Sequence, residues 1–196
     1  EQMKKEQQNK NKWKAQGHGE YSELAQGQDT RDVAREFFEA SKRSDRLVVH
    51  FYRSTTPSCD ILHAHLQKLA PKHLETRFVK INVEGADDER GGGGGSFFLV
   101  EKLGIRVMPT LLIVKNRKVE HHMRGFDELG ATEDFSTELL AYILGKHGVL
   151  IAKEDEEHPP ELEEGAGSSF GLNRVRISGS KQRNDGHRSL EEEDFY

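Results

Sequence analysis

Any thiol chemistry in this sequence has to begin with its single cysteine, Cys59. A thiolate is the nucleophile of disulfide exchange, and a dithiol cycle needs a second thiol to resolve the mixed disulfide. One cysteine therefore excludes an intramolecular disulfide, a two-thiol redox cycle and a cysteine-rich zinc site within the chain. Monothiol chemistry, such as glutathione capping or an intermolecular disulfide, stays an alternative. The simpler interpretation is a packed, unreactive thiol.

Ten histidines raise the question of a metal site. His63 and His65 are two apart on an expected helix, so they point to different faces. His121 and His122 are adjacent on an expected strand and point to opposite faces. The sequence contains no His-x₃-His or Cys–His spacing typical of zinc ligands, and the glycine run 91–95 lacks the Lys-Ser/Thr of a phosphate-binding loop. We expect neither a metal nor a cofactor.

Charge is unevenly distributed along the 196 residues, whose formal net charge is −5. Residues 151–196 contain six basic and twelve acidic side chains, for a net charge of −6, so the first 150 residues carry +1. A nearly neutral body argues against duplex nucleic acid as the main ligand. No apolar run approaches the ~18 residues of a membrane span. Because the sequence begins at Glu1 rather than Met, we expect a fragment or a processed form, with an upstream signal as an open alternative.

The elements that must position these residues follow from hydrophobic periodicity. Apolar residues recurring every three or four positions predict helices, and short runs rich in β-branched and aromatic residues predict strands. Their order is helix, strand, helix, strand, helix, strand, strand, helix, which implies an α/β domain with a mixed sheet covered on both faces. The expected helices span residues 29–44, 59–70, 97–103 and a last segment capped by Thr132 and ended by Gly145, and the expected strands span 47–52, 77–83, 110–114 and 119–124.

Three segments differ in composition from this domain, which we place at residues 29–148. Residues 1–28 predict a polar helix that stops at Gly17-His18-Gly19. Residues 84–96 predict a flexible insertion, because five consecutive glycines lose much backbone entropy on ordering. Residues 149–196 predict a disordered acidic tail.

Two segments resemble the thioredoxin fold. The strand and loop of residues 49–59 have the spacing of the thioredoxin active-site segment, and Met108-Pro109-Thr110 lies where thioredoxins have their cis-proline. The resemblance therefore implies a thioredoxin-like three-layer fold and a cis peptide bond before Pro109. It also places Thr56 at the attacking cysteine, Cys59 at the resolving cysteine and His50 at the buried aspartate. The expected degenerate redox site comprises Thr56, Pro57, Ser58, Cys59 and Pro109.

A narrower resemblance, to phosducin-like thioredoxin-domain proteins, runs from about residue 10 to 148. It rests on the segment from Trp13 to Tyr21 followed by Glu23, and on the segments 50–53, 72–76 and 125–130. Members of this family have little redox activity and bind the cytosolic chaperonin containing TCP-1. The resemblance therefore implies a protein that modulates the ATPase of the chaperonin and its folding of tubulin and actin, and that acts in microtubule organisation. The implied location is cytoplasmic, with nuclear or centrosomal pools as further options. The expected partner-binding residues are Trp13, Gly17, His18, Gly19 and Tyr21.

The sequence as a whole predicts a non-catalytic, thioredoxin-like co-chaperone of the chaperonin, with no nucleic-acid or membrane partner. Two alternatives stay open. One is a monothiol redox protein or sensor that uses Cys59. The other is a general peptide-binding module that uses a groove beside Pro109.

Overall fold

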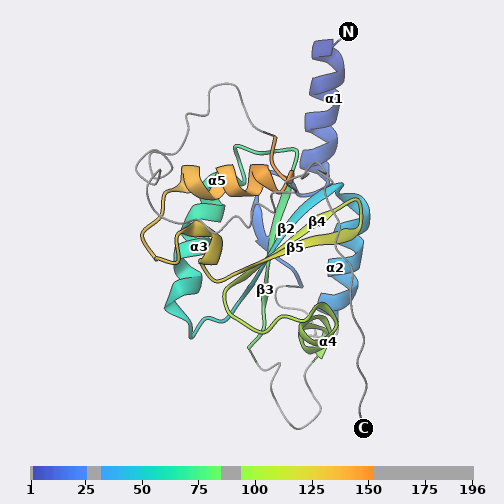
Figure 1. The fold of residues 1–196 in the computed structure, drawn as a ribbon. Helices are drawn as coiled ribbons and strands as arrows, with labels where there is room; N and C mark the ends of the chain where they lie inside the picture. Colours follow the sequence, from blue (N-terminus) through green and yellow to red (C-terminus); the bar gives the residue numbers. More distant parts are fainter. Residues whose placement is uncertain (1, 26–31, 85–93, 152–196) are drawn as a thin grey trace, which may run out of the picture. The chain divides into compact units, whose positions relative to one another are not determined.

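A five-stranded mixed sheet forms the centre of the protein (Figure 1). The computed structural model describes residues 2–25, 32–84 and 94–151. The strand order is β1-β3-β2-β4-β5, in which β1, β3 and β2 are parallel and β4 and β5 are antiparallel to their neighbours. The elements are α1 (Gln2–Ala15), β1 (Tyr21–Glu23), α2 (Asp32–Arg43), β2 (Arg46–Tyr52), α3 (Pro57–Leu69), β3 (Arg77–Asn82), α4 (Gly94–Leu103), β4 (Thr110–Lys115), β5 (Lys118–Arg124), the 3-10 helix η1 (Asp127–Leu129) and α5 (Thr137–Lys146).

Helices cover both faces of the sheet, because alternate residues of each strand point to opposite sides. On β2, Leu47, Val49 and Phe51 pack in one apolar cluster with residues of α2 and α4. Val48, between them, belongs to a second cluster with residues of α3 and α5. In Figure 1, α2 and α4 lie on one side of the sheet and α3 and α5 on the other. The predicted three-layer arrangement is therefore confirmed.

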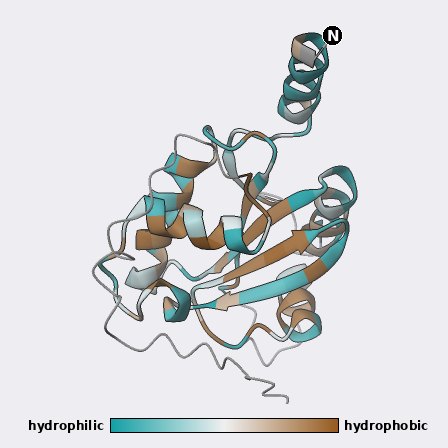
Figure 2. Ribbon diagram, turned by 45° about the horizontal axis from the view of Figure 1, so that its top comes forward, coloured by the Kyte–Doolittle hydropathy of each residue, from teal (hydrophilic) through white to brown (hydrophobic). Residues whose placement is uncertain are grey.

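Hydropathy separates the central strands from the N-terminal helix. Figure 2 shows hydrophobic colour along β2 and β4, whose residues are almost all buried. Helix α1 is coloured mostly hydrophilic, as expected for a helix without an apolar stripe. Among the described helices, none is long and apolar enough to cross a membrane.

Several predicted boundaries are wrong at the ends of elements. The last helix is capped by the Ser136 hydroxyl, which accepts a hydrogen bond from the Leu139 N–H, and not by Thr132. It continues through Gly145 to Lys146. Helix α4 begins at Gly94, so three residues of the predicted insertion 84–96 are helical, while residues 85–93 lie outside the described part.

The domain is also wider than residues 29–148. Strand β1, within the N-terminal segment, pairs with β3 and belongs to the sheet. Val149 and Leu150, in the predicted tail, are buried in the cluster beneath α5. The sequence pattern missed β1 because three half-buried residues give no clear alternation. Residues 152–196, the rest of the predicted acidic tail, lie outside the described part of the chain.

The turn between β4 and β5 offers a test of backbone strain. Asn116 and Arg117 both have positive φ, at 49° and 68°, and such a pair strongly favours glycine at the second position. Replacing Arg117 with Gly should raise the free energy of unfolding by about 0.5–1 kcal/mol, because the left-handed backbone strain of a residue with a Cβ is removed. Urea denaturation measures the change. Arg117→Ala removes the same exposed side chain without relieving the strain, and an equal gain in that variant would contradict the interpretation.

Candidate functional site

The start of α3 corresponds to the place of the thioredoxin redox centre, and here its N-cap position carries no thiol. Thr56 is the N-cap residue, and its side chain makes no capping hydrogen bond among the described residues. Pro57 follows as the first residue of the helix. The Ser58 hydroxyl donates a hydrogen bond to Glu133 at 2.7 Å. A threonine hydroxyl cannot form a mixed disulfide, so the exposed end of this helix cannot start thiol exchange.

Cys59 lies in the first turn of the helix and is completely buried. Burial raises the pKa of its thiol, and the nearby Asp60 carboxylate adds to the rise. A buried thiol with a raised pKa holds little thiolate at neutral pH, and the thiolate is the reactive form. Cys59 therefore behaves as a small apolar residue of the core.

The Met108–Pro109 peptide bond is cis, as predicted. Pro109 itself is buried, and Met108 lines a cleft of about 300 Å³ together with Thr56. The structure thus brings the start of α3 and the cis-proline segment to one cleft. The other lining residues are Arg53, Val83, Val100, Glu101, Ile105 and Arg106.

A polar cluster lies between β2 and α3. The Tyr21 hydroxyl lies 2.7 Å from Nδ1 of His50 and 2.8 Å from Nδ1 of His63. His50 is the residue aligned with the buried aspartate of thioredoxins, and its side chain is fully buried. Burial lowers the pKa of His50 well below its ordinary value, with additional lowering from His63 and Lys80. His50 is therefore neutral, and a charged proton acceptor is replaced by a neutral hydrogen-bonding group.

The hydrogen bonds of this cluster assign its tautomers. One tyrosine hydroxyl can donate to one of the two imidazoles and must accept from the other. Nε2 of His50 is buried and has no hydrogen-bond partner among the described residues. An orphaned N–H there would cost more than an orphaned lone pair, so we assign the proton of His50 to Nδ1. Nδ1 of His50 then donates to Tyr21, and Tyr21 donates to His63.

His18 fastens the N-terminal segment to the domain. Its side chain is 3% exposed, with Nδ1 2.8 Å from the Leu74 carbonyl and Nε2 2.9 Å from the Ser44 hydroxyl. A carbonyl only accepts, so Nδ1 carries the proton, and Nε2 accepts from Ser44 because burial lowers the pKa of the ring. Trp13 stacks on His18 with ring centroids 6.4 Å apart. Both ring nitrogens of His18 are therefore used within the protein.

Steric constraints explain why glycines stand on either side of His18. Gly17 and Gly19 have φ values of +84° and +90°, which residues with a Cβ rarely adopt. A Cβ on Gly19 would lie 2.8 Å from the Leu74 side chain. The Gly-His-Gly pattern thus lets the chain turn sharply while the imidazole enters a buried site.

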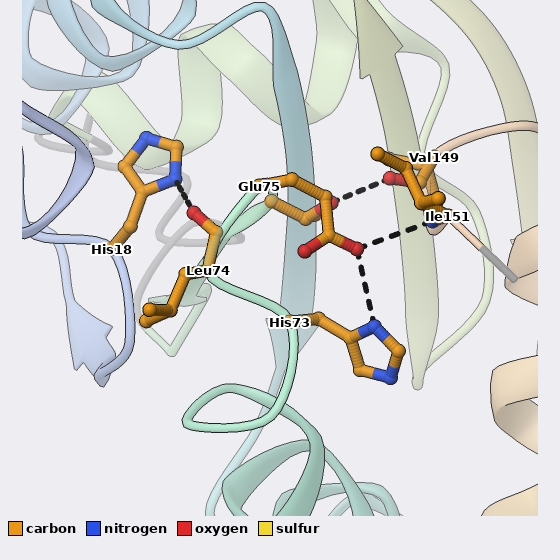
Figure 3. A network of polar contacts seen from close by, with 7 residues as sticks. His18, His73, Leu74, Glu75, Val149 and Ile151 are labelled. Atoms are coloured by element: carbon orange, nitrogen blue, oxygen red, sulfur yellow. Dashed lines mark hydrogen bonds and ion pairs between the residues drawn. The ribbon is translucent and has the colours of Figure 1, made fainter. Parts of the chain in front are cut away.

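The loop that receives His18 also holds the C-terminal end of the described chain (Figure 3). The Glu75 carboxylate accepts hydrogen bonds from Nδ1 of His73 and from the Ile151 N–H, both at 3.1 Å. The Thr76 hydroxyl donates to the Val149 carbonyl. The hydrogen bonds from His73 and Ile151 lower the pKa of Glu75, although burial opposes them. One loop, residues 73–76, therefore fixes both ends of the domain.

The structure places Thr56 to Cys59 at the start of α3 and Pro109 after a cis peptide bond. The sequence did not reveal which of the predicted site residues act together. The N-terminal segment is attached to the domain by Trp13, Gly17, His18 and Gly19, which we call the His18 fastening. Tyr21 instead belongs to the hydrogen-bonded cluster beside Cys59. His63 is absent from the predicted site, because a lone histidine on a helix carries no signal of its partner across the sheet. The predicted difference in face between His63 and His65 is confirmed, since His65 contacts Thr137 on α5 instead.

Comparison with known proteins identifies the family. The thioredoxin family model matches residues 30–137. Thioredoxin domain-containing protein 9 of Mus musculus is 40% identical over 185 residues, covering 93% of this chain and 74% of the relative. The chain belongs to the family of thioredoxin domain-containing protein 9. Phosducin-like protein 3 of Drosophila melanogaster is a further relative, 39% identical over 153 residues and covering 78% of this chain and 63% of that protein.

Among solved structures, a mutant thioredoxin from Halobacterium salinarum NRC-1 is 17% identical, with a TM-score of 0.49, covering 68% of this chain and 96% of that one. In this member of the thioredoxin domain-containing protein 9 family, the match to the thioredoxin family model begins at residue 30. That match therefore does not include β1 or the His18 fastening. The relatives' similarity covers more of the chain than the domain model does.

The burial of Cys59 predicts slow chemical labelling. In the folded protein, a thiol reagent such as 5,5′-dithiobis(2-nitrobenzoate) should react with Cys59 at least about 100-fold more slowly than in denaturant, because reaction needs local opening. Stopped-flow absorbance measures both rates. The Cys59→Ser variant sets the background. Rapid stoichiometric labelling of the native protein would instead indicate a working thiol.

The buried histidines predict a loss of stability in mild acid. Burial lowers the pKa of His18, His50 and His63 in the folded state, whereas the unfolded chain titrates near pH 6.5. The unfolded state then binds more protons, so the free energy of unfolding should fall between about pH 7.5 and pH 5.5. Replacing His50 with Gln should flatten this slope by up to about 1.4 kcal/mol per pH unit. Urea titrations at several pH values measure it.

Cys59→Ala provides the control for this slope. It removes a buried side chain beside this cluster, but the thiol has a raised pKa and does not titrate in this window. Its unfolding free energies should be lower at every pH, with an unchanged slope. Equal slopes for the wild type and His50→Gln would show that His50 is not the titrating group.

Proposed function

We propose that the protein is a non-catalytic co-chaperone that binds and modulates the cytosolic chaperonin containing TCP-1. The observation that carries this proposal is a thioredoxin centre with no exposed thiol, joined to an N-terminal segment that is built into the domain. Thr56 stands at the helix start, Cys59 is buried, and His18 holds the preceding chain in place. A thioredoxin fold that lacks the reactive thiol supports a binding role rather than a redox role. The resemblance to the phosducin-like family suggests the chaperonin as the binding partner.

Helix α1 is the part of the chain best suited to contact that partner. It carries five lysines and one glutamate, and its described side chains are exposed except for half-buried Trp13. Trp13 stacks on His18, so the end of α1 is tied to the His18 fastening. A basic helix tied at one end favours association with an acidic surface, through long-range attraction before contact. We assign the partner contact to the exposed face of α1 and to Trp13.

We extend the proposal to the folding clients of the chaperonin. Binding at the chaperonin would modulate its ATPase and its folding of tubulin and actin, and through them microtubule organisation. The corresponding location is cytoplasmic, with nuclear or centrosomal pools. Nothing in this role uses the thiol of Cys59.

A second candidate function is peptide binding at the cleft beside Pro109. The observation that favours it is the cleft itself, which combines apolar walls with the charged residues Arg53, Glu101 and Arg106. Such a mixture suits an extended peptide with one or two polar anchors. This role would use the cleft rather than α1, so the two candidates predict different effects of mutation.

Charge reversal on α1 separates the two candidates. Replacing Lys5, Lys10 and Lys12 with Glu should weaken the binding of purified chaperonin by about 10-fold or more, because attraction becomes repulsion. Surface plasmon resonance measures the affinity, and ATP hydrolysis by the chaperonin measures the modulation. Thr56→Trp, which fills the cleft, should leave both unchanged; Thr56 makes no capping hydrogen bond that would be lost among the described residues.

A matched control reverses three exposed charges elsewhere, at Lys68, Lys118 and Arg124. This variant should bind as the wild type does. Loss of binding in Thr56→Trp, with α1 charge reversal silent, would favour the peptide-binding candidate. Absence of chaperonin binding by the wild type, with no effect on its ATPase, would overturn the proposal.

A further inference from the structure

Three side chains that lie far apart in the sequence meet beside the edge strand β5. His121 comes from β5, Glu128 from η1, and His147 is the C-cap residue of α5. Nε2 of His121 is 2.5 Å from one Glu128 oxygen, and Nε2 of His147 is 2.6 Å from the other. The ligand atoms of all three lie within 4.8 Å of one another. One carboxylate is thus held between two imidazoles.

The two imidazoles lie face to face in this cluster. Their ring centroids are 4.0 Å apart and their planes differ by 16°. This stacking places both Nε2 atoms on the same side, toward the carboxylate. The hydrogen bonds from both histidines lower the pKa of Glu128, although burial opposes them. Glu128 is therefore an anion at neutral pH, close to two nitrogen donors.

The donor set is one that zinc accepts. Two imidazole nitrogens and one carboxylate oxygen are the three protein ligands of many zinc sites, with a fourth position left to water or another ligand. Tetrahedral coordination with bonds of about 2.0–2.1 Å places ligand atoms about 3.3 Å apart. The Glu128 oxygen that binds the ion would therefore withdraw by less than about 1 Å from the nitrogen to which it is hydrogen-bonded, while the two ring nitrogens converge, a change that side-chain torsions can provide.

Solvent can reach the cluster. The side chains of His121, Glu128 and His147 are 35%, 31% and 25% exposed. An ion can therefore reach these side chains from solvent without unfolding of the domain. His122, the neighbour of His121 on β5, points the other way and lies 2.8 Å from the Leu103 carbonyl through its Nε2.

We propose that His121, Glu128 and His147 form a binding site for Zn²⁺ or a similar divalent transition-metal ion. When the ion binds, the Nε2 protons that make these hydrogen bonds leave the two rings or move to Nδ1, and three coordination bonds to the ion replace the hydrogen bonds. Because the ligands come from β5, η1 and the end of α5, the bound ion joins three elements that are otherwise held by packing and by these hydrogen bonds. The site is independent of the proposed chaperonin binding.

Metal-dependent stability tests the site in the full, tag-free chain. Thermal unfolding is followed after removal of metals with a chelator and again after addition of ZnCl₂. At a free Zn²⁺ concentration about 100-fold above the dissociation constant, the melting temperature should rise by about 5 °C or more, because the ion binds the folded state. With Co²⁺ as a probe, visible absorption bands should report three-ligand, four-coordinate binding.

Variants assign the signal to these residues. His121→Gln, His147→Gln and Glu128→Gln should each weaken Zn²⁺ binding by at least the ~10–100-fold that outer-shell partners contribute, and should abolish the cobalt bands. His122→Gln, on the opposite face of the same strand, should keep the full metal-induced shift even if its own starting stability is lower. Isothermal titration calorimetry measures the affinities independently of unfolding.

Two results would overturn the proposal. One is a wild-type protein that gains no stability and shows no cobalt bands. The other is a metal response that is the same in the wild type and in all three ligand variants, which would place binding at other histidines or carboxylates of the chain. In either case, the three residues form a hydrogen-bonded cluster only.

Discussion

The two hydrogen bonds of the His18 ring are the constraint on which the N-terminal half of this structure depends. One nitrogen must donate to the Leu74 carbonyl and the other must accept from Ser44, so the imidazole has a single tautomer and orientation. That orientation places the following residues alongside β3, where β1 forms. The pairing in turn carries Tyr21 into the core, where its hydroxyl joins the two histidines. A single buried ring thus connects a surface helix to the centre of the sheet.

The degenerate site shows how a thioredoxin centre can lose its chemistry without losing its shape. The cis-proline and the strand-to-helix turn are kept, and the cleft between them is open. What has changed is charge. The thiol of the attacking cysteine is replaced by the hydroxyl of Thr56, and a carboxylate is replaced by the neutral imidazole of His50. Tyr21, from the N-terminal segment, holds this imidazole through its hydroxyl.

Sequence patterns predicted the elements that have strong periodicity and the residues that belong to known motifs. The buried run of β2 follows from local chemistry, and the cis-proline segment beside Thr56 follows from the resemblance to the thioredoxin fold. Three features did not follow. Strand β1 is too short to show a period, Ser136 competes with Thr132 as a cap, and Val149 is buried by a contact with a distant loop. The cluster of His121, Glu128 and His147 depends on three elements meeting, which no spacing along the chain encodes.

Strand β1 has a consequence for the solubility of the domain. Without it, β3 would be an edge strand, and its backbone N–H and C=O groups along one side would face solvent. β3 contains the buried run Phe78-Val79, so such an edge would be both unpaired and apolar on its faces. Exposed edges of this kind template pairing with other chains. The short N-terminal strand therefore protects β3 from pairing with other chains. Its position depends on the hydrogen bonds of His18, because a strand of three residues makes few hydrogen bonds of its own.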